Sequence, residues 1–378
     1  MRIRTLLPMA CDGVGPSQTC INIVRGMHHA GADVDVLVNR MRIPRKGVPA
    51  RALLAGPFAR IPYPWVSRLL TEVLERWYLR RLEGDELAYL WPAASLGVHR
   101  EVHRRSIPIV LEGINTRMKS AKDILDRAYH DFGAEPSHGI TQARIDEEEE
   151  KLSLASAIFA PSVNVENALA DGEVGAAVLS TSYGIHVPIP LPRKAASNGR
   201  ETVFVFCGYG SIRKGMHHLL EAWSSMPKTA KLRILGRIEP LIANRFHQLL
   251  ESDHVEVLGF VDDVALYFAT SDVFVLPSLE EGDPLVTYEA ALSGLPLMAS
   301  TMGAGRMAKS AWIIDPANRS EFLAALQAMH ADPDLRDEWA RRAQTAVVDY
   351  DWFHVAASRL HSLVGLFGGD SSSDIVDS

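Results

Sequence analysis

Two glutamates eight positions apart, Glu281 and Glu289, are the residues whose chemistry is easiest to place along this chain. Before them, the apolar run at 273–276 is typical of a strand that is buried on both faces. After it we expect a short helix over residues 284–293, because Asp283 is a good N-cap and Pro284 suits the first helical position. The two carboxylates then lie just before this helix and within it.

The N-terminus of that helix is expected to bind a diphosphate. Open α/β sheets bind ligands outside the carboxyl ends of their strands. Unpaired amide groups and the positive end of the helix dipole would point into this crevice. A carboxylate accepts two or more hydrogen bonds, so Glu281 and Glu289 suit the hydroxyl groups of a sugar and of a ribose. Without this context, two solvent-facing glutamates and a helix cap would be the simpler interpretation.

The residues around this site resemble a known family. From Glu281 to Pro296 the sequence follows Glu-Gly-x6-Glu-Ala…Gly-x-Pro, which resembles the signature of the family 4 glycosyltransferases. That family has the GT-B fold, with two Rossmann-like α/β domains facing each other across a cleft. The resemblance is strong over residues 203–316 and reaches the first half only in outline. Further matching stretches are Phe206-Cys207-Gly208, Arg213-Lys214-Gly215, residues 258–261 and residues 271–278.

The resemblance implies roles for individual residues. Glu281 would contact the donor sugar and act in catalysis, Glu289 would bind the ribose, and Lys214 would neutralise the leaving diphosphate. Tyr209 stands where the family has an arginine, five positions before the lysine, so we expect Arg213 to substitute for it. The expected donor contacts are Gly13, Gly15, Gly208, Lys214, Gly282, Asp283, Pro284, Leu285, Val286 and Glu289.

Candidates in the first half are fewer. A catalytic histidine often ends the family's first-domain strand, which we expect here at 107–111. Glu112 occupies that place, so it is a catalytic candidate, and Asn115 is a candidate on the acceptor side; either could instead be a turn residue. Gly13 and Gly15 follow the first strand, where a plain strand-to-helix turn is as good an interpretation as a donor contact.

The reaction implied is transfer of a hexose from a nucleotide-diphosphate sugar to a hydroxyl acceptor, with retention of configuration, in polysaccharide or glycolipid assembly. Cations and helix amides would do the work of a divalent ion, so we expect neither a metal nor a cofactor. Asp33 and Asp35 form an Asp-x-Asp pattern, which can hold a metal ion when it follows an apolar strand. Here the apolar residues come after the two aspartates, so the pattern indicates the start of a strand.

Length and composition set the organisation. A chain of 378 residues suits two α/β domains. We expect an acceptor-binding domain at 1–190, a linker at 191–200, a donor-binding domain at 201–350, a helix at 351–367 that packs back on the first domain, and a disordered tail at 368–378. The net charge of −7 disfavours a general nucleic-acid binder. Three scattered cysteines favour a cytoplasmic protein.

The segment 40–81 is basic and threaded with aromatic residues, and a helix is expected over 65–82. A solvated face over packed aromatics and a patch for anionic lipid headgroups on the inner face of a membrane are equal alternatives. The acceptor would be a carbohydrate or a lipid-linked saccharide.

Two other functions are alternatives. A nicotinamide-dependent oxidoreductase is disfavoured because Asn39 and Arg40 replace the acidic residue expected after the second strand. A non-catalytic nucleotide-sugar-binding protein stays open because of Tyr209.

Overall fold

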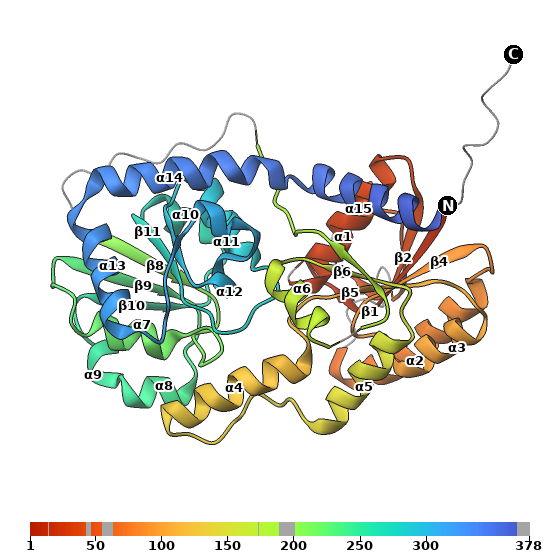
Figure 1. Cartoon of the computed structure of the whole chain (residues 1–378), viewed down its shortest axis with the longest axis horizontal. Coiled ribbons are helices and arrows are strands. Elements are labelled where there is room, and N and C mark those ends of the chain that lie inside the picture. Colours follow the sequence, from red (N-terminus) through yellow and green to blue (C-terminus); the bar gives the residue numbers. More distant parts are fainter. Residues whose placement is uncertain (14, 43–46, 55–62, 173, 189–200, 369–378) are drawn as a thin grey trace, which may run out of the picture.

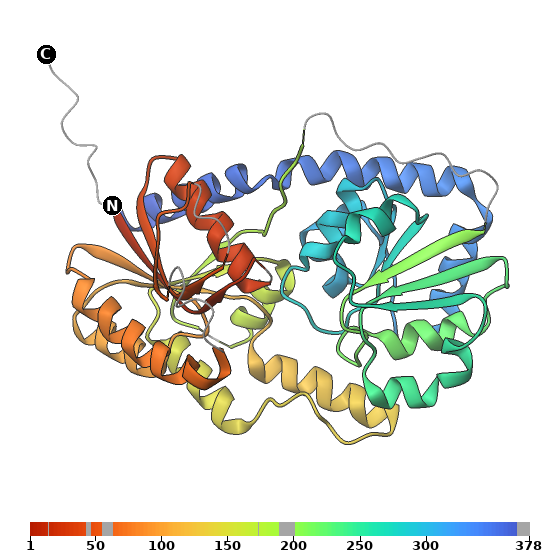
Figure 2. The same cartoon turned by 180° about the vertical axis from the view of Figure 1, so that it is seen from behind.

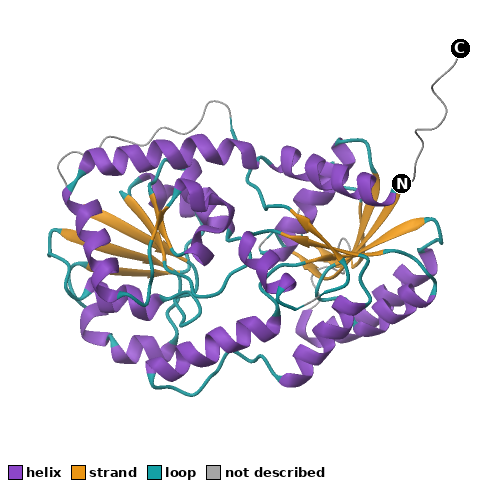
Figure 3. Ribbon diagram, viewed as in Figure 1, coloured by secondary structure: helices purple, strands orange, loops and turns teal. Residues whose placement is uncertain are grey.

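The computed structural model describes residues 1–13, 15–42, 47–54, 63–172, 174–188 and 201–368. Two α/β domains lie side by side, and each is a parallel sheet with helices on both faces (Figures 1 and 3). The linker expected at 191–200 and the tail from 369 lie outside the described residues.

The N-terminal domain is built around a seven-stranded sheet in the order β3-β2-β1-β4-β5-β6-β7, with parallel pairing throughout. The order reverses between β1 and β4, as in Rossmann-like domains. Its elements are β1 (Arg2–Cys11), α1 (Pro16–His29), β2 (Asp33–Met41), β3 (Ala50–Leu54), α2 (Tyr63–Arg81), β4 (Glu86–Leu90), α3 (Leu96–Arg104), β5 (Ile109–Glu112), α4 (Met118–Phe132), α5 (Gln142–Ser153), β6 (Ala157–Ala160), α6 (Val163–Ala170) and β7 (Ala177–Ser180).

The C-terminal domain holds a six-stranded parallel sheet in the order β10-β9-β8-β11-β12-β13, which reverses between β8 and β11. Its elements, with the final helices, are β8 (Thr202–Cys207), α7 (Met216–Trp223), β9 (Ala230–Leu235), α8 (Pro240–Arg245), α9 (His247–Leu250), β10 (Val255–Gly259), α10 (Val264–Ala269), β11 (Val273–Leu276), α11 (Leu285–Leu292), β12 (Leu297–Ala299), α12 (Thr301–Ala304), η2 (Gly305–Ser310), β13 (Trp312–Ile313), α13 (Arg319–Ala331), α14 (Pro333–Val347), η3 (Val348–Tyr350) and α15 (Trp352–Phe367).

Buried apolar strands explain why the sheet cores form. Every residue of β11 is fully buried, as expected for a strand covered by helices on both faces. Phe204 and Trp223 pack edge to face beneath β8, with ring centroids 5.3 Å apart. These strands fix the two loops, after β8 and after β11, that carry the predicted donor residues.

The C-terminal helix crosses back to the first domain. Figures 1 and 2 show α14 and α15 running along one side of the molecule, with α15 lying against α1 of the N-terminal domain. The contact is close, because a Cβ added at Gly26 of α1 would overlap Ala356 of α15. On the opposite side, α4 reaches the C-terminal domain, where the Tyr129 hydroxyl donates to Glu239 at 2.6 Å.

Several local expectations need correction. Asp283 does not cap α11, because Pro284 is the N-cap residue and no side chain bonds to the first turn. The strands β3, β4, β12 and β13 were not predicted; β4 begins with Glu86, a charged residue whose carboxylate accepts from Arg4 Nε at 2.7 Å. The strand expected at 107–111 runs from Ile109 to Glu112 and so includes the residue expected after its end.

Candidate active site between the two domains

Two loops of the C-terminal domain meet at the point where its strand order reverses. Lys214 lies in the loop after β8, and Glu281 lies in the loop after β11, the neighbouring strand. Such switch points are the usual ligand sites of open parallel sheets. The Lys214 ammonium donates a hydrogen bond to the Glu281 carboxylate, so the sheet topology joins residues that are 67 positions apart.

Glu281 is surrounded by donors. Ser278 Oγ donates to Glu281 Oε1 at 3.2 Å, and Arg213 Nη2 lies 3.7 Å from Glu281 Oε2. Burial alone would raise the pKa of Glu281, but the charges of Lys214 and Arg213 hold this pKa below its ordinary value. Glu281 is therefore an ionised acceptor at neutral pH.

Glycines allow these loops to approach each other. Gly215 has a φ of 66°, and a Cβ there would overlap the carbonyl of Pro277 in the loop after β11. A Cβ at Gly282 would overlap the carbonyl of Ile114 in the N-terminal domain. A side chain at either position would therefore push one loop away from its neighbour.

Glu289 lies on α11, near the end of β8. Burial raises the pKa of its carboxyl. Burial also raises the pKa of the Cys207 thiol to about 12, and the charges of Glu289 and Lys214 both act on this thiol. The stem of Lys214 packs on Gly208, whose added Cβ would lie 3.2 Å from Lys214 Cε. Lys214 and Glu289 thus both act on the thiol at the end of β8.

The start of α11 follows directly on the loop that holds Glu281. Pro284 is buried, whereas Leu285 and Val286 are partly exposed in the first turn of this eight-residue helix. Amide groups in a first helical turn have no acceptor within the helix. The diphosphate contacts expected at Leu285 and Val286 stay a prediction.

Asp283 is placed differently. Its carboxylate is buried and accepts hydrogen bonds from the Tyr183 amide (2.8 Å), the Tyr288 hydroxyl (2.5 Å) and the Arg306 amide (3.1 Å). Tyr183 belongs to the N-terminal domain, so this acid joins the two domains. Burial raises the pKa of Asp283 to about 6. Its side-chain oxygens are engaged in the interior, and the donor contact expected of Asp283 stays a prediction.

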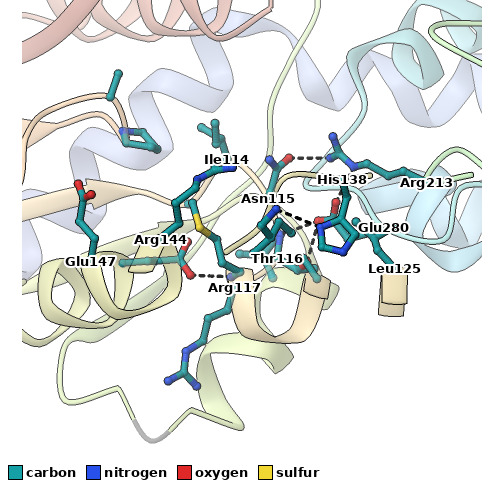
Figure 4. Close-up of a pocket in the computed structure, with 18 of the residues that line it drawn as sticks. Ile114, Asn115, Thr116, Arg117, Leu125, His138, Arg144, Glu147, Arg213 and Glu280 are labelled. Atoms are coloured by element: carbon teal, nitrogen blue, oxygen red, sulfur yellow. Dashed lines mark hydrogen bonds and ion pairs between the residues drawn. The ribbon is translucent and has the colours of Figure 1, made fainter. Parts of the chain in front are cut away.

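Glu280 is the residue that sequence reasoning missed. Its carboxylate accepts from the Thr116 amide (3.1 Å) and hydroxyl (2.7 Å) in the N-terminal domain, and from Arg213 Nε (2.6 Å) in its own domain. Arg213 Nη2 also donates to Asn115 Oδ1 at 3.0 Å. Figure 4 shows this group at the edge of the cavity. Glu280 therefore orients Arg213 within its own domain and joins it to the N-terminal domain through Thr116. Its position beside Glu281 was the only signal.

A cavity of about 1040 Å³ lies between the domains beside this group (Figure 4). The C-terminal domain contributes Arg213, Lys214 and Glu280 to its lining, and the N-terminal domain contributes Asn115 and Thr116 among others. Tyr209, at the place of the family arginine, also lines it and is 51% exposed. The cavity is large enough for a substrate-sized molecule.

Glu112 also borders this cavity, but its carboxylate is turned into the N-terminal domain. It pairs with Arg359 of α15 at 2.7 Å, accepts from the Tyr89 hydroxyl, and its side chain is 0% exposed, as is that of Arg359. An acid held in this way has no free oxygen for a substrate. The ion pair with Arg359 thus gives Glu112 a structural role, and the catalytic role expected of it stays a prediction.

The remaining N-terminal candidates lie at the reversal point of their own sheet. Gly13 and Gly15 are in the loop after β1, both with positive φ, and a Cβ at Gly15 would meet nothing within 4 Å. This loop is compatible both with a simple turn into α1 and with a ligand contact. Asp33 and Asp35 are near Arg4 at the start of β2, as a strand start predicts.

Within the described ranges, no group of three or more His, Cys, Asp or Glu side chains is arranged to hold a metal ion. None of the helices in this part of the chain has both the length and the apolar character needed to cross a membrane.

Residues 201–332 match the family model of "Glycosyl transferases group 1". An uncharacterized glycosyltransferase of Haemophilus influenzae is 25% identical over 170 residues, which is 42% of this chain and 48% of the relative. The chain thus spans about half the length of that curated relative. The resemblance inferred from the motifs is confirmed over the matched residues.

Solved structures are similar over nearly the whole chain. Sucrose-phosphate synthase from Thermosynechococcus elongatus has a TM-score of 0.72 at 18% identity and covers 97% of this chain and 100% of its own. HepE of Anabaena, solved with UDP and glucose, has a TM-score of 0.70 at 15% identity, covering 97% and 99%. These likenesses confirm the predicted fold, two facing Rossmann-like domains of the GT-B type.

Proposed function

Since residues 201–332 form a group 1 glycosyltransferase domain within a GT-B fold, we propose that this protein transfers a sugar, a hexose, from a nucleotide-diphosphate donor to a hydroxyl acceptor. One observation carries the proposal: Lys214 and Glu281 touch at the reversal point of the donor-side sheet, beside an interdomain cavity. Lys214, a cation that could neutralise a leaving phosphate, therefore lies next to Glu281, an ionised carboxylate that could accept hydrogen bonds from sugar hydroxyls.

The donor would lie across the loops after β8 and β11. Its diphosphate would meet the amides at the start of α11 and the ammonium of Lys214, for which it competes with Glu281. Glu281 would then accept hydrogen bonds from the donor sugar. Glu289, further along α11, would accept them from the ribose hydroxyls.

The chemical step breaks the bond between the anomeric carbon and the diphosphate oxygen. The acceptor hydroxyl forms the new bond on the same face of the sugar, which retains configuration, and the leaving phosphate accepts its proton. Lys214 and Arg213 stabilise the charge that develops on the leaving group, which is the work a divalent ion does elsewhere. Arg213 is already oriented by Glu280 and Asn115.

The acceptor would bind in the interdomain cavity, where Asn115 of the N-terminal domain lies beside Arg213. We place the reaction in polysaccharide or glycolipid assembly, in the cytoplasm. Peripheral contact with an anionic membrane is supported by α2, where Arg68 and Arg76 are exposed together with Leu69 and Val73. Sedimentation with anionic and neutral vesicles, with both arginines replaced by alanine as comparison, tests this contact.

The donor is tested by thermal shift with UDP-, GDP- and dTDP-sugars, followed by turnover with the donor that stabilises the protein. Lys214→Ala should lower kcat about 100-fold or more, because one group that stabilises the leaving charge is lost. Glu289→Ala should raise the donor KM about tenfold through lost hydrogen bonds to a charged group. Lys228→Ala and Glu251→Ala, both at exposed positions, are the controls.

Unchanged kinetics in both Lys214→Ala and Glu289→Ala would refute the site. Donor binding without product or donor hydrolysis, under any acceptor, would instead favour a non-catalytic nucleotide-sugar-binding protein, the alternative kept open by Tyr209.

A further inference from the structure

A buried carboxylate that the proposed reaction does not use joins the two domains beside the donor site. Glu239 follows β9, is 6% exposed, and borders the interdomain cavity. Its Oε2 accepts a hydrogen bond from the Ile212 amide at 2.9 Å. Its Oε1 accepts from the Tyr129 hydroxyl at 2.6 Å and from Ser137 Oγ at 3.4 Å. The first donor belongs to the C-terminal domain and the other two to the N-terminal domain, so one acid connects both.

The amide that Glu239 holds belongs to the turn that carries both cations of the proposed site. This cation turn, residues 211–215, lies between β8 and α7 and contains Arg213 and Lys214. Amides near its end donate to carbonyls at its start, at 3.1 and 2.9 Å, so the turn moves as one piece. Ile212 directly precedes Arg213 in this turn. A shift of the Ile212 amide would therefore move both cations.

The backbone of Glu239 is fixed within its own domain. Its amide donates to the Gly210 carbonyl at 3.0 Å, and the Gly210 amide donates to the Arg237 carbonyl at 2.8 Å. The loop after β9 thus lies alongside the loop after β8. What the side chain of Glu239 adds to this pairing is the connection to Tyr129 on α4.

The end of α4 rests on the C-terminal domain through a second residue as well. Arg245 of α8 stacks on the Phe132 ring, with Cζ 3.5 Å from the ring centroid, and donates to the Phe132 carbonyl. The Phe132 ring also meets His217 of α7 edge to face, with ring centroids 5.5 Å apart. Figure 1 shows α4 reaching across to α8. The helix is therefore seated on the two elements that directly follow the cation turn and Glu239.

The bond between Tyr129 and Glu239 depends on this seating. Burial, with the hydrogen bond to Glu239, raises the pKa of Tyr129 to about 12, so the hydroxyl keeps its proton at neutral pH and donates it. A buried carboxylate oxygen that loses its donor is costly. With α4 withdrawn, the Glu239 carboxylate would turn toward water and release the Ile212 amide.

We propose that Glu239 is a positioning residue that makes the orientation of Arg213 and Lys214 depend on the seating of α4. Substrates enter between domains that part and close again. In the closed protein, Tyr129 satisfies Glu239, and Glu239 holds the cation turn. In the open protein the turn loses this anchor, so the leaving diphosphate is stabilised only when both domains enclose the substrates. This inference rests on the proposed function and adds a device that regulates its site.

The test is Tyr129→Phe, which removes only the hydroxyl. We expect kcat to fall about tenfold while the donor KM changes less than about twofold, because the cations stabilise charge that develops in the transition state. Tyr78→Phe is the matched control. Tyr78 is also buried and its hydroxyl donates to the Arg4 carbonyl at 2.9 Å, but it is not part of the cavity lining. Unchanged kcat in Tyr129→Phe, or an equal fall in both variants, would overturn the proposal.

Combined and conservative variants test the route of the effect. In the Lys214→Ala background, Tyr129→Phe should lower kcat by less than about threefold, because residues that act through one another are not additive. Glu239→Gln should keep kcat within about threefold of the native value, since its amide oxygen can accept from Ile212 and its NH₂ can donate to Tyr129. Glu239→Ala should lose at least as much as Tyr129→Phe. Full additivity with Lys214→Ala, or equal losses in the two Glu239 variants, would contradict the route. Tyr129→Phe decides the matter should Glu239→Ala fail to fold.

Amide hydrogen exchange separates this inference from the proposed function. Tyr129→Phe should speed exchange of the Ile212 amide about tenfold, measured without substrate on peptides that cover residues 208–215. Faster exchange together with no turnover of any nucleotide-sugar by the unmodified protein would remove the proposed function and leave the link between α4 and the cation turn standing. Turnover by the unmodified protein with unchanged kcat in Tyr129→Phe would remove the inference alone.

Discussion

The buried pair of Glu112 and Arg359 offers the sharpest test of whether an acid near the cavity is structural or catalytic. Both side chains are 0% exposed, and Arg359 also donates to the Ser182 carbonyl at 3.0 Å. In Glu112→Gln, the guanidinium loses its counter-charge inside the protein. Breaking a buried pair from one side costs about 3–5 kcal/mol, because a buried charge is left uncompensated. We therefore expect Glu112→Gln to destabilise the N-terminal domain by about 3 kcal/mol.

The double variant Glu112→Gln, Arg359→Met removes both charges. Replacing a buried ion pair with groups of similar volume is often close to neutral, and Arg359 Nε has no hydrogen-bond partner even in the native pair. Stability should therefore return to within about 1–2 kcal/mol of the native value. Urea unfolding followed by tryptophan fluorescence measures this, and turnover with the preferred donor is measured on the same samples.

A structural Glu112 predicts that activity returns with stability in the double variant. A double variant as stable as the native protein but about 100-fold slower would show that Glu112 takes part in the reaction. Unchanged stability in Glu112→Gln would refute the argument from burial.

Three further changes test the donor loops and the cavity wall. Glu280→Gln removes the charge that orients Arg213, so we expect kcat to fall about tenfold while the donor KM changes little. Rates of nucleotide release at saturating and at limiting donor concentrations measure both constants. Glu148 has a folded pKa of about 7 against an ordinary 4.5, so the folded state binds more protons between these values and stability falls as pH rises through them. The Glu148→Gln variant should therefore be about 3 kcal/mol more stable than the native protein above pH 7 and equally stable near pH 4.5. Urea unfolding measures both free energies, and the same unfolding curve for the two proteins at both pH values would contradict the raised pKa. Gly215→Ala forces a side chain against the carbonyl of Pro277, so we expect the free energy of unfolding to fall by more than about 1 kcal/mol in the same assay. A smaller decrease would show that the two loops are packed less closely than described.

The sequence predicted the parts of the structure whose signals are local. The run 273–276 is an unbroken apolar stretch and became β11, and the helix expected at 284–293 became α11 within one residue at each end. The strand β4 escaped prediction because Glu86 starts it, and only the folded structure supplies Arg4 as its partner. Local signals thus located β11 and α11, whereas β4 depends on a charge that is paired at long range, and β12 and β13, with three and two residues, are too short to give a pattern.

The same distinction holds for the site. Lys214 and Glu281 were predicted from motifs and touch in the structure. The roles of Glu112 and Glu280 depend on partners 247 and 164 positions away, Arg359 and Thr116, which no local pattern identifies. Asp283 has the residue type of a helix cap, but its position at the domain boundary gives it other partners.

The return of α15 to the first domain has a consequence for biosynthesis. The charged partner of Glu112 lies on α15, so a nascent chain carries this carboxylate without its counter-charge while the second domain is being translated. The close contact of Gly26 with Ala356 likewise forms only after that point. The packing of the N-terminal domain is thus completed by a helix that follows the whole C-terminal domain in the sequence, and a fragment ending before residue 352 would lack that helix.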